Sequence, residues 1–323
     1  MSTPSLHVFV VGATGTIGRA VVDALVRRGH EVVCFMRPAS SRSGLPEACH
    51  IRIGDVLDPA SVRREGFRGE RFDAVVSCMA SRSGVPDDAW AVEHDAHRHL
   101  LDVAIEADVD HFVLLSAICV QKPALAFQRA KLAFEGALRE SGVDWSIVRP
   151  TAFFKSISGQ IERVKSGKPY LLFGDGTGTA CKPIADEDLA EYMVECLENP
   201  EFRNRILPIG GPGPELTPRD QGELLFEVAG REPRFRRIPL AAMHAIVAVL
   251  EFLGRVIPPL RDKAELARIG RYYATESMLV WDAERGRYDA DATPEYGTRT
   301  LEGYYRRRLE GEVGDQRGEH AVL

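Results

Sequence analysis

The sequence predicts an α/β protein built on a doubly wound parallel sheet, with a smaller lobe in the C-terminal half. Short apolar runs alternate with segments of helical periodicity as far as about Pro150. A glycine-rich turn joins the first apolar run to the first helical segment, and small or polar residues follow the later runs. The alternation weakens beyond Lys155, so we expect residues 1–155 to form the sheet domain, completed by later segments, and residues 156–310 to form the smaller lobe.

The composition is that of a globular protein and excludes several functional classes. The chain has 323 residues, of which 45% are hydrophobic, and its net charge of -6 gives no basic footprint for a nucleic-acid partner. Its 6 cysteines include no CxxC pair, so we expect free thiols in a reducing compartment and no metal site. The first apolar run begins almost at the N-terminus, which leaves no room for a targeting peptide and predicts a cytoplasmic protein.

The glycine-rich turn is the first candidate binding site. It follows the predicted strand His7–Val11 and opens a helix that continues through Val26. Such a turn brings backbone N–H groups and the positive end of a helix dipole close to a ligand, and a dinucleotide pyrophosphate is the expected ligand. A plain glycine-rich connection is the alternative, which we favour less. The candidate residues are Gly12, Thr14, Gly15, Thr16, Ile17 and Gly18.

The second predicted strand, Glu31–Met36, ends at Arg37. In NAD-specific proteins of this architecture, an acidic residue near this point binds the ribose 2′-hydroxyl. A guanidinium group instead pairs with phosphate, so Arg37 favours a 2′-phosphate and therefore NADPH. The alternative is a solvated surface arginine.

Further candidate residues end or follow the next three predicted strands. These strands cover residues 50–55, 72–78 and 111–116, and the carboxyl ends of parallel strands share one edge of a sheet, where ligands bind. We therefore expect contributions to the cofactor site from Asp55, Cys78, Ala80, Ser81 and Ser116. A helix of residues 90–107 carries His94, His97 and His99, which we interpret as solvated helix residues and not as metal ligands.

A predicted helix over residues 124–141 carries Phe127 and Lys131, which lie four positions apart and therefore share one face. The sixth predicted strand, Asp144–Arg149, follows this helix. After that strand come Pro150, Thr151, Phe153, Phe154 and Lys155.

These residues together resemble an atypical short-chain dehydrogenase/reductase, whose sheet is of the Rossmann type. The resemblance rests on the glycine turn, Ser116 and Lys131. In that superfamily Lys131 would be the lysine of a Tyr-x-x-x-Lys motif, which binds the nicotinamide ribose and lowers the pKa of the tyrosine. Here Phe127 stands at the tyrosine position, which puts carbonyl reduction by the usual route in doubt.

Within that superfamily, the chain most resembles the divinyl chlorophyllide a 8-vinyl-reductases, and the likeness covers nearly its whole length. The matching stretches are residues 115–123, 127–132, 148–156, 173–176, 181–184, 207–213, 268–273 and 276–279. Phe127 belongs to the pattern of that family. The resemblance implies NADPH-dependent reduction of a vinyl group to ethyl on a magnesium tetrapyrrole of the chlorophyllide type, in chlorophyll or bacteriochlorophyll synthesis. Plant members carry a transit peptide that we do not see here, so the resemblance implies a bacterial enzyme.

The resemblance also predicts roles for single residues. Lys131 and Phe127 would be the catalytic pair, and Lys131, Pro150, Thr151 and Phe153 would contact the cofactor. Because hydride addition to a conjugated vinyl group spreads charge over the macrocycle, no tyrosine acid is required at position 127. The predicted substrate contacts are Phe154, Lys155, Tyr170, Cys181 and Lys182. Among them, Tyr170, Cys181 or Lys182 would compete with water as the proton donor, and Lys155 or Lys182 would bind the propionate.

The most apolar segment of the second half runs over residues 240–257. It is shorter than a membrane span requires, so we expect a core helix first, a wall of the pigment site second and a peripheral contact with the photosynthetic membrane third. We expect residues 311–323 to be a disordered tail. Two other functions remain open: a non-catalytic regulator that senses NADP, and a reductase of another conjugated alkene.

Overall fold

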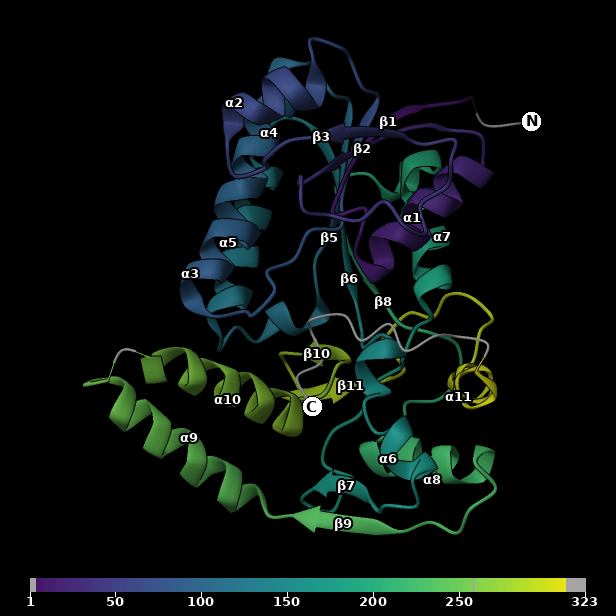
Figure 1. Ribbon diagram of the computed structural model, residues 1–323, viewed down its shortest axis with the longest axis vertical. Helices are drawn as coiled ribbons and strands as arrows, with labels where there is room; N and C mark the ends of the chain where they lie inside the picture. The colour runs from purple at the N-terminus through teal and green to yellow at the C-terminus, as the bar shows by residue number, and fades with distance from the viewer. Residues whose placement is uncertain (1–3, 258, 312–323) are drawn as a thin grey trace.

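The computed structural model describes residues 4–257 and 259–311, and it confirms the predicted doubly wound parallel sheet. The strand order is β3-β2-β1-β4-β5-β6-β8, and every neighbouring pair is parallel (Figure 1). The order reverses between β1 and β4, so the loops after these two strands open the crevice in which such sheets bind ligands. The strands are β1 (His7–Val11), β2 (Glu31–Met36), β3 (His50–Ile53), β4 (Ala74–Ser77), β5 (His111–Leu115), β6 (Asp144–Pro150) and β8 (Arg205–Ile209).

Helices cover both faces of this sheet. On one face α1 (Thr16–Arg27) and α7 (Asp186–Glu198) pack against each other, and α1 directs Ile17, Val21 and Leu25 toward the strands. The other face buries a second apolar cluster that includes Phe9, Phe112 and Phe134. The elements on this face are α2 (Pro59–Ser61), η1 (Val62–Phe67), α3 (Pro86–Ala89), η2 (Trp90–Ala96), α4 (His97–Glu106) and α5 (Ala126–Arg139).

The second lobe has its own core and is made from two separate stretches of chain. Strand β7 pairs in parallel with β9, and the core beneath them includes Phe154, Tyr170, Phe226 and Tyr305. Residues 186–209 leave this lobe and return to the large sheet as α7 and β8, so the lobe expected over 156–310 is interrupted there. Its elements are η4 (Lys155–Ile157), α6 (Ile161–Lys165), β7 (Tyr170–Phe173), α8 (Pro218–Val228), β9 (Phe235–Ile238), β10 (Val280–Asp282), β11 (Arg287–Asp289) and α11 (Leu301–Glu310). Two short helices flank strands of the large sheet along the chain: η3 (Ile118–Gln121) follows β5, and η5 (Pro200–Phe202) precedes β8.

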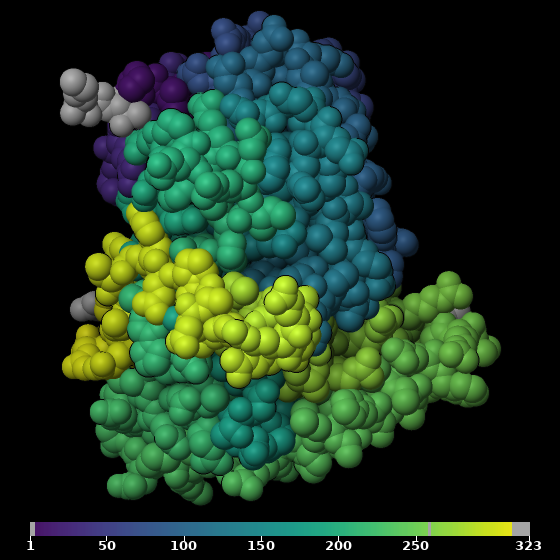
Figure 2. Space-filling view, turned by 180° about the vertical axis from the view of Figure 1, so that it is seen from behind, coloured from purple at the N-terminus to yellow at the C-terminus, as the bar shows by residue number. Residues whose placement is uncertain are grey.

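A segment near the C-terminus fastens the two lobes together. After β8, the Gly210 amide donates to the Pro294 carbonyl at 2.8 Å, and the Tyr296 amide donates to the Gly210 carbonyl at 2.9 Å. The Arg299 amide donates to an oxygen of the buried Asp188 carboxylate at 2.9 Å, near the start of α7. Figure 2 shows this yellow segment across the junction of the lobes. The predicted tail over 311–323 lies, apart from Gly311, outside the described residues.

Two helices, α9 (Leu240–Gly254) and α10 (Pro259–Thr275), pack side by side and project from the body of the protein (Figures 1 and 2). The expectation that α9 is a core helix is wrong. Val247 is buried, but Ile246 is 57% exposed and Phe252 is 66% exposed, because α10 covers only one side of α9. Over the residues that the structure describes, no helix is long and apolar enough to cross a membrane.

Candidate active site

The glycine turn after β1 forms a cradle that side chains would fill. Gly12 has a φ of 75°, and a Cβ there would lie 2.5 Å from the Cys78 carbonyl carbon of the neighbouring strand end. A Cβ on Gly18 would lie 2.1 Å from the Gly12 oxygen, so α1 can approach the turn only with glycine at this position. Helix α1 begins at Thr16 with no side-chain cap and no acidic residue in its first turn. Its first N–H groups and positive dipole end are therefore available for an anion such as a pyrophosphate.

The strand ends place the other predicted cofactor residues along the same edge of the sheet. Arg37 follows β2 and Asp55 follows β3, and both side chains are exposed. Cys78, Ala80 and Ser81 follow β4, beside the glycine cradle. These residues lie at the edge of the sheet where such folds bind a dinucleotide, and Arg37 follows the strand beside which a 2′-phosphate would lie.

Lys131 is held in a buried ion pair that the sequence analysis did not identify. Its Nζ donates to Glu93 Oε2 at 2.7 Å, and the other oxygen of Glu93 accepts from the Ser81 backbone amide at 2.9 Å. Both side chains are nearly inaccessible to solvent. Glu93 comes from η2, a π-helical segment within the helix predicted over 90–107, so a long-range contact fixes the ammonium group of α5 at the end of β4. The sequence carries no signal that distinguishes Glu93 from the other carboxylates of the segment 90–107.

A second buried network joins Ser116, which follows β5, to Glu135 on helix α5. The Ser116 Oγ donates to Glu135 Oε1 at 2.5 Å, and Arg149 at the end of β6 forms an ion pair with the same carboxylate. Glu135 lies one helical turn beyond Lys131, which itself lies one turn beyond Phe127. One face of α5 therefore presents an aromatic ring, a cation and an anion toward the ends of β4, β5 and β6.

Phe127 packs against apolar groups. It joins a cluster that contains Cys119, Ile269 and Tyr272, so α10 of the second lobe covers the start of α5. A Cβ on Gly84 would lie 3.0 Å from Ile269 Cδ1 and 3.6 Å from Phe127 Cδ1, which shows how closely these groups approach. The Ala126 amide donates to Glu265 of α10 at 3.0 Å and fixes this contact.

His97 is buried, which corrects the expectation of a solvated helix histidine. Its Nε2 lies 2.7 Å from Ser77 Oγ and its Nδ1 lies 2.8 Å from the Val92 carbonyl oxygen. Burial lowers the pKa of His97 to about 4. No group of His, Cys, Asp or Glu residues able to hold a metal ion occurs in the part of the chain that the structure describes.

Lys155 lies beside the glycine cradle, since its Nζ donates to Thr16 Oγ1 at 2.7 Å. Nearby Asp186 has a buried oxygen without a hydrogen-bond partner. Burial and the neighbouring Glu187 raise the pKa of Asp186 to about 7, and Lys155 opposes this shift. The position of Lys155 suits a cofactor phosphate better than a substrate carboxylate.

The remaining predicted substrate residues do not come together around one opening. Phe154 and Tyr170 are core residues of the second lobe, and burial raises the pKa of Tyr170. Cys181 is buried, which raises the pKa of its thiol to about 12. Lys182 Nζ lies 2.5 Å from Glu295 Oε1, and its ammonium is therefore already paired. Phe153 forms an isolated β-bridge with Ile184, and Thr151 is buried. Both residues lie where the chain passes from β6 into the second lobe.

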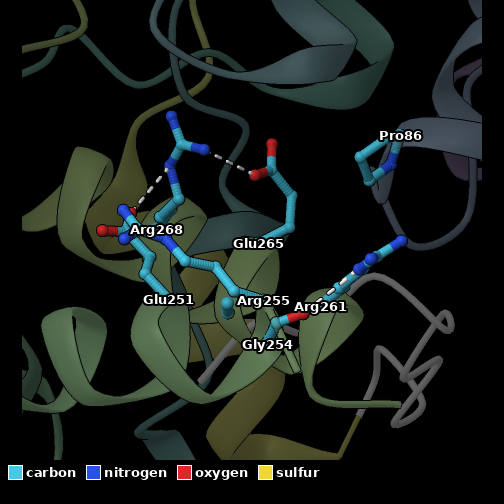
Figure 3. A pocket seen from close by; sticks show the side chains of 8 residues that line it. Pro86, Glu251, Gly254, Arg255, Arg261, Glu265 and Arg268 are labelled. Carbon is cyan, nitrogen blue, oxygen red and sulfur yellow. Dashed lines mark hydrogen bonds and ion pairs between the residues drawn. The ribbon is translucent and has the colours of Figure 1, made fainter. Parts of the chain in front are cut away.

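A recess of about 640 Å³ lies between the start of α3 and the α9–α10 pair (Figure 3). Arg268 bonds within it to Glu265 at 3.2 Å and to Glu251 at 3.5 Å, and Arg261 Nε donates to the Gly254 carbonyl at 3.1 Å. These contacts join α9 to α10, and Glu265 also accepts a hydrogen bond from the Ala126 amide at the start of α5.

Comparisons with known proteins concern the family of the chain. A family described as NAD(P)H-binding matches residues 12–200, more than half of the chain. The divinyl chlorophyllide a 8-vinyl-reductase, chloroplastic, of Oryza sativa subsp. indica is 48% identical over 98% of this chain and 82% of the rice protein. The protein of the same name from Arabidopsis thaliana is 44% identical over 98% of this chain and 80% of its own length.

The fold is also similar to that of solved structures. The structure of the NADPH-dependent quinone oxidoreductase QOR2 of Escherichia coli, complexed with NADPH, covers 94% of this chain and 99% of its own, with a TM-score of 0.66. At 16% sequence identity this likeness shows the fold alone.

Proposed function

Because the chain belongs to the family of divinyl chlorophyllide a 8-vinyl-reductases, we propose that it reduces the 8-vinyl group of 3,8-divinyl chlorophyllide a to ethyl with NADPH. The observation that carries the proposal is the buried Lys131 beside Phe127, at the sheet edge that also holds the glycine cradle. In the proposed reaction this edge of the sheet is the hydride-transfer site, and it lacks the tyrosine of carbonyl reduction.

The residues of the edge fit NADPH. A Cβ on Gly12 or Gly18 would clash with the backbone, so the turn, which also contains Gly15, presents bare main chain to a pyrophosphate, and Arg37 offers a partner for the 2′-phosphate. We assign Lys131 to the nicotinamide ribose and Lys155 to a phosphate, on the basis of its contact with Thr16. When bound, NADPH supplies the hydride, and the protein supplies position and electrostatics.

The substrate side of the site is apolar where Phe127 lies. A hydrocarbon ring at this position stacks or packs against a nicotinamide or a tetrapyrrole and adds no hydroxyl that would need a partner. Charge that develops over a conjugated macrocycle has no single oxygen to protonate. The ammonium of Lys131 favours such an electron-rich transition state from nearby.

One assay separates this function from its two alternatives. Purified protein is mixed with NADPH and divinyl chlorophyllide, and the Soret band is followed together with NADPH consumption. We expect a blue shift of the Soret band with one NADPH consumed per product, and none when NADPH is left out. An NADP-sensing regulator would bind NADPH without this shift, and a reductase of another alkene would consume NADPH only with that alkene; either result would refute the proposal.

We also propose that α9 contacts the surface of the photosynthetic membrane in which pigments reside. The support is its exposed apolar side, which includes Ile246, Val249 and Phe252, and the exposed basic residues Arg236 and Arg237 that precede it. Apolar residues flanked by arginines are typical of helices that lie at an anionic lipid surface.

A further inference from the structure

The recess between the start of α3 and the α9–α10 pair is lined mainly by charged side chains (Figure 3). Three arginines and two glutamates line it, so positive charges exceed negative ones. The arginines are Arg255, Arg261 and Arg268, and the glutamates are Glu251 and Glu265. A concave surface with an excess of guanidinium groups favours an anionic ligand, above all a carboxylate or a phosphate.

Two of the three guanidinium groups retain donors for such a ligand. The glutamates pair with Arg268, as described above. Arg261 donates through Nε to the Gly254 carbonyl at 3.1 Å, and its two terminal amino groups form no hydrogen bond or ion pair with the described residues. Figure 3 shows this side chain extending from α10 toward Pro86. Arg255, at the C-terminal end of α9, is exposed and likewise has no partner within the described part of the chain.

The recess adjoins the aromatic end of the candidate active site. Glu265 on one wall accepts a hydrogen bond at 3.0 Å from the amide of Ala126, which directly precedes Phe127. Pro86 on the other wall follows two residues after Gly84, where a Cβ would lie 3.6 Å from Phe127 Cδ1. Both walls therefore connect the recess to the immediate surroundings of Phe127.

The proposed substrate carries its charge at a distance from its reacting group. A chlorophyllide is a flat, largely apolar macrocycle whose free carboxylate ends a propionate side chain, and its 8-vinyl group lies on the opposite pyrrole ring. With the vinyl group beside the nicotinamide, the carboxylate lies beyond the apolar part of the site. Lys155 and Lys182 are poorly placed for it, because Lys155 bonds to Thr16 at the glycine cradle and Lys182 pairs with Glu295.

We propose that the recess binds the propionate carboxylate of the chlorophyllide, with Arg255 and Arg261 as the residues that contact it. This inference rests on the proposed function. Ile269 lies one helical turn after Glu265 and belongs to the same apolar cluster as Phe127, so an apolar surface leads from the recess to the reacting end. The carboxylate contact then anchors one side of the macrocycle and turns the vinyl group on the other side toward the nicotinamide.

The test compares the binding of divinyl chlorophyllide a with that of its propionate methyl ester, which lacks the charge. Dissociation constants are measured by fluorescence quenching in lipid-free buffer with NADP⁺ bound, so that no turnover occurs. We expect wild type to bind the acid roughly tenfold or more tightly than the ester. Arg255→Gln and Arg261→Gln should each weaken binding of the acid by roughly tenfold and leave the ester within about twofold. Lys263→Gln, an exposed cation of α10 outside the recess, is the matched control and should bind like wild type.

The same variants in the reductase assay should raise KM for the chlorophyllide and leave KM for NADPH unchanged. Arg255→Gln removes no contact to a described residue, so it keeps the test valid even if Arg261→Gln loosens α10 and lowers Tm. Equal affinity of wild type for acid and ester overturns the inference, and so does a preference for the acid that both variants retain. If both variants instead lose binding to anionic vesicles and keep that preference, the recess binds a lipid headgroup and the inference is wrong. Wild type that prefers the acid without reducing its vinyl group would refute the proposed function alone.

Discussion

At the scale of single residues, the proposed site depends on one face of α5, where Phe127, Lys131 and Glu135 follow at successive turns. Each has a partner from a different element, namely α10, η2 and the end of β6. Two of these partnerships are buried ion pairs, which are expensive to break because the remaining charge cannot reach water. The site is therefore rigid where the nicotinamide and the vinyl group have to be aligned.

Replacing Lys131 tests the charge that this face presents. Lys131→Ala alone would leave Glu93 buried and unpaired, which costs about 3–5 kcal/mol of stability, so the better variant is Lys131→Met combined with Glu93→Gln. We expect kcat to fall by roughly two orders of magnitude or more, because positioning and one electrostatic contact are lost. Single-turnover rates and Tm are measured together. A rate within threefold of wild type in a folded double variant would remove Lys131 from the chemistry.

Replacing Phe127 tests why the tyrosine is missing. Phe127→Tyr should give no gain in vinyl reduction, because no oxyanion forms that its hydroxyl could protonate, and a partly buried phenol without a partner costs stability. Phe127→Leu should keep partial activity, since only packing is lost. Single-turnover hydride transfer decides the matter. If Phe127→Tyr accelerates that step several-fold, position 127 can supply the limiting acid and this explanation fails.

The choice of cofactor depends on Arg37. Wild type should prefer NADPH strongly over NADH, and Arg37→Asp should lower kcat/KM for NADPH by roughly 10- to 100-fold, because a charge-assisted contact to phosphate becomes a repulsion. Arg37→Lys should retain part of the preference, since it keeps the charge and loses the bidentate geometry. Equal kcat/KM values for the two cofactors in wild type would exclude Arg37 from this role.

At the scale of elements, α9 is where the sequence was least informative. Its apolar residues predicted burial, and the periodicity could not show that α10 would cover only one side. By contrast, β1, β2 and β5 were predicted at or within one residue of their observed bounds, since short apolar runs between turn signals are a local property. Glu93 was missed because a long-range partner, and not a local pattern, gives it its position.

The exposed side of α9 predicts binding to anionic lipid. Wild type should sediment with vesicles that contain phosphatidylglycerol, and binding should weaken with salt because Arg236 and Arg237 contribute to it. Phe252→Asp and Val249→Asp should each reduce binding by about tenfold or more, since a charge enters the apolar contact. Ile105→Asp, on an exposed apolar position of α4, is the matched control and should bind like wild type.

The same variants also test the alternative role of α9. Suppose that wild type binds no vesicle, and that Phe252→Asp raises KM for the chlorophyllide in a lipid-free assay while NADPH binding is preserved. Helix α9 would then be a wall of the pigment site, and the proposed membrane contact would be wrong.

At the scale of the whole molecule, Asp186 links stability to pH. Its pKa of about 7 in the folded state lies above the ordinary value of 3.8, so the folded protein binds this proton more tightly than the unfolded chain does. The free energy of unfolding contributed by Asp186 is therefore largest at low pH and is lost as pH rises toward 7. Buried His97 and His111, with pKa values of about 4, act in the opposite direction between pH 6.5 and 4.

The variant Asp186→Asn isolates this contribution. Its Tm relative to wild type should increase between pH 4 and 7 and stay constant above, and each kcal/mol should move Tm by about 2 °C in a chain of this size. Thermal unfolding at pH 5, 6.5 and 8 measures the difference. A Tm difference that is the same at all three values would contradict the raised pKa of Asp186.

The interrupted course of the second lobe has a consequence for how the protein is made. Strand β6 emerges from the ribosome before its outer neighbour β8, and residues 151–185 of the other lobe are synthesised in between. During that interval the nascent chain carries an unpaired sheet edge and lacks α7, which later covers the apolar groups beside α1. The growing polypeptide therefore exposes this edge and these apolar groups until α7 and β8 have been added. Helix α1, although encoded near the start of the gene, gains its covering helix only late in translation.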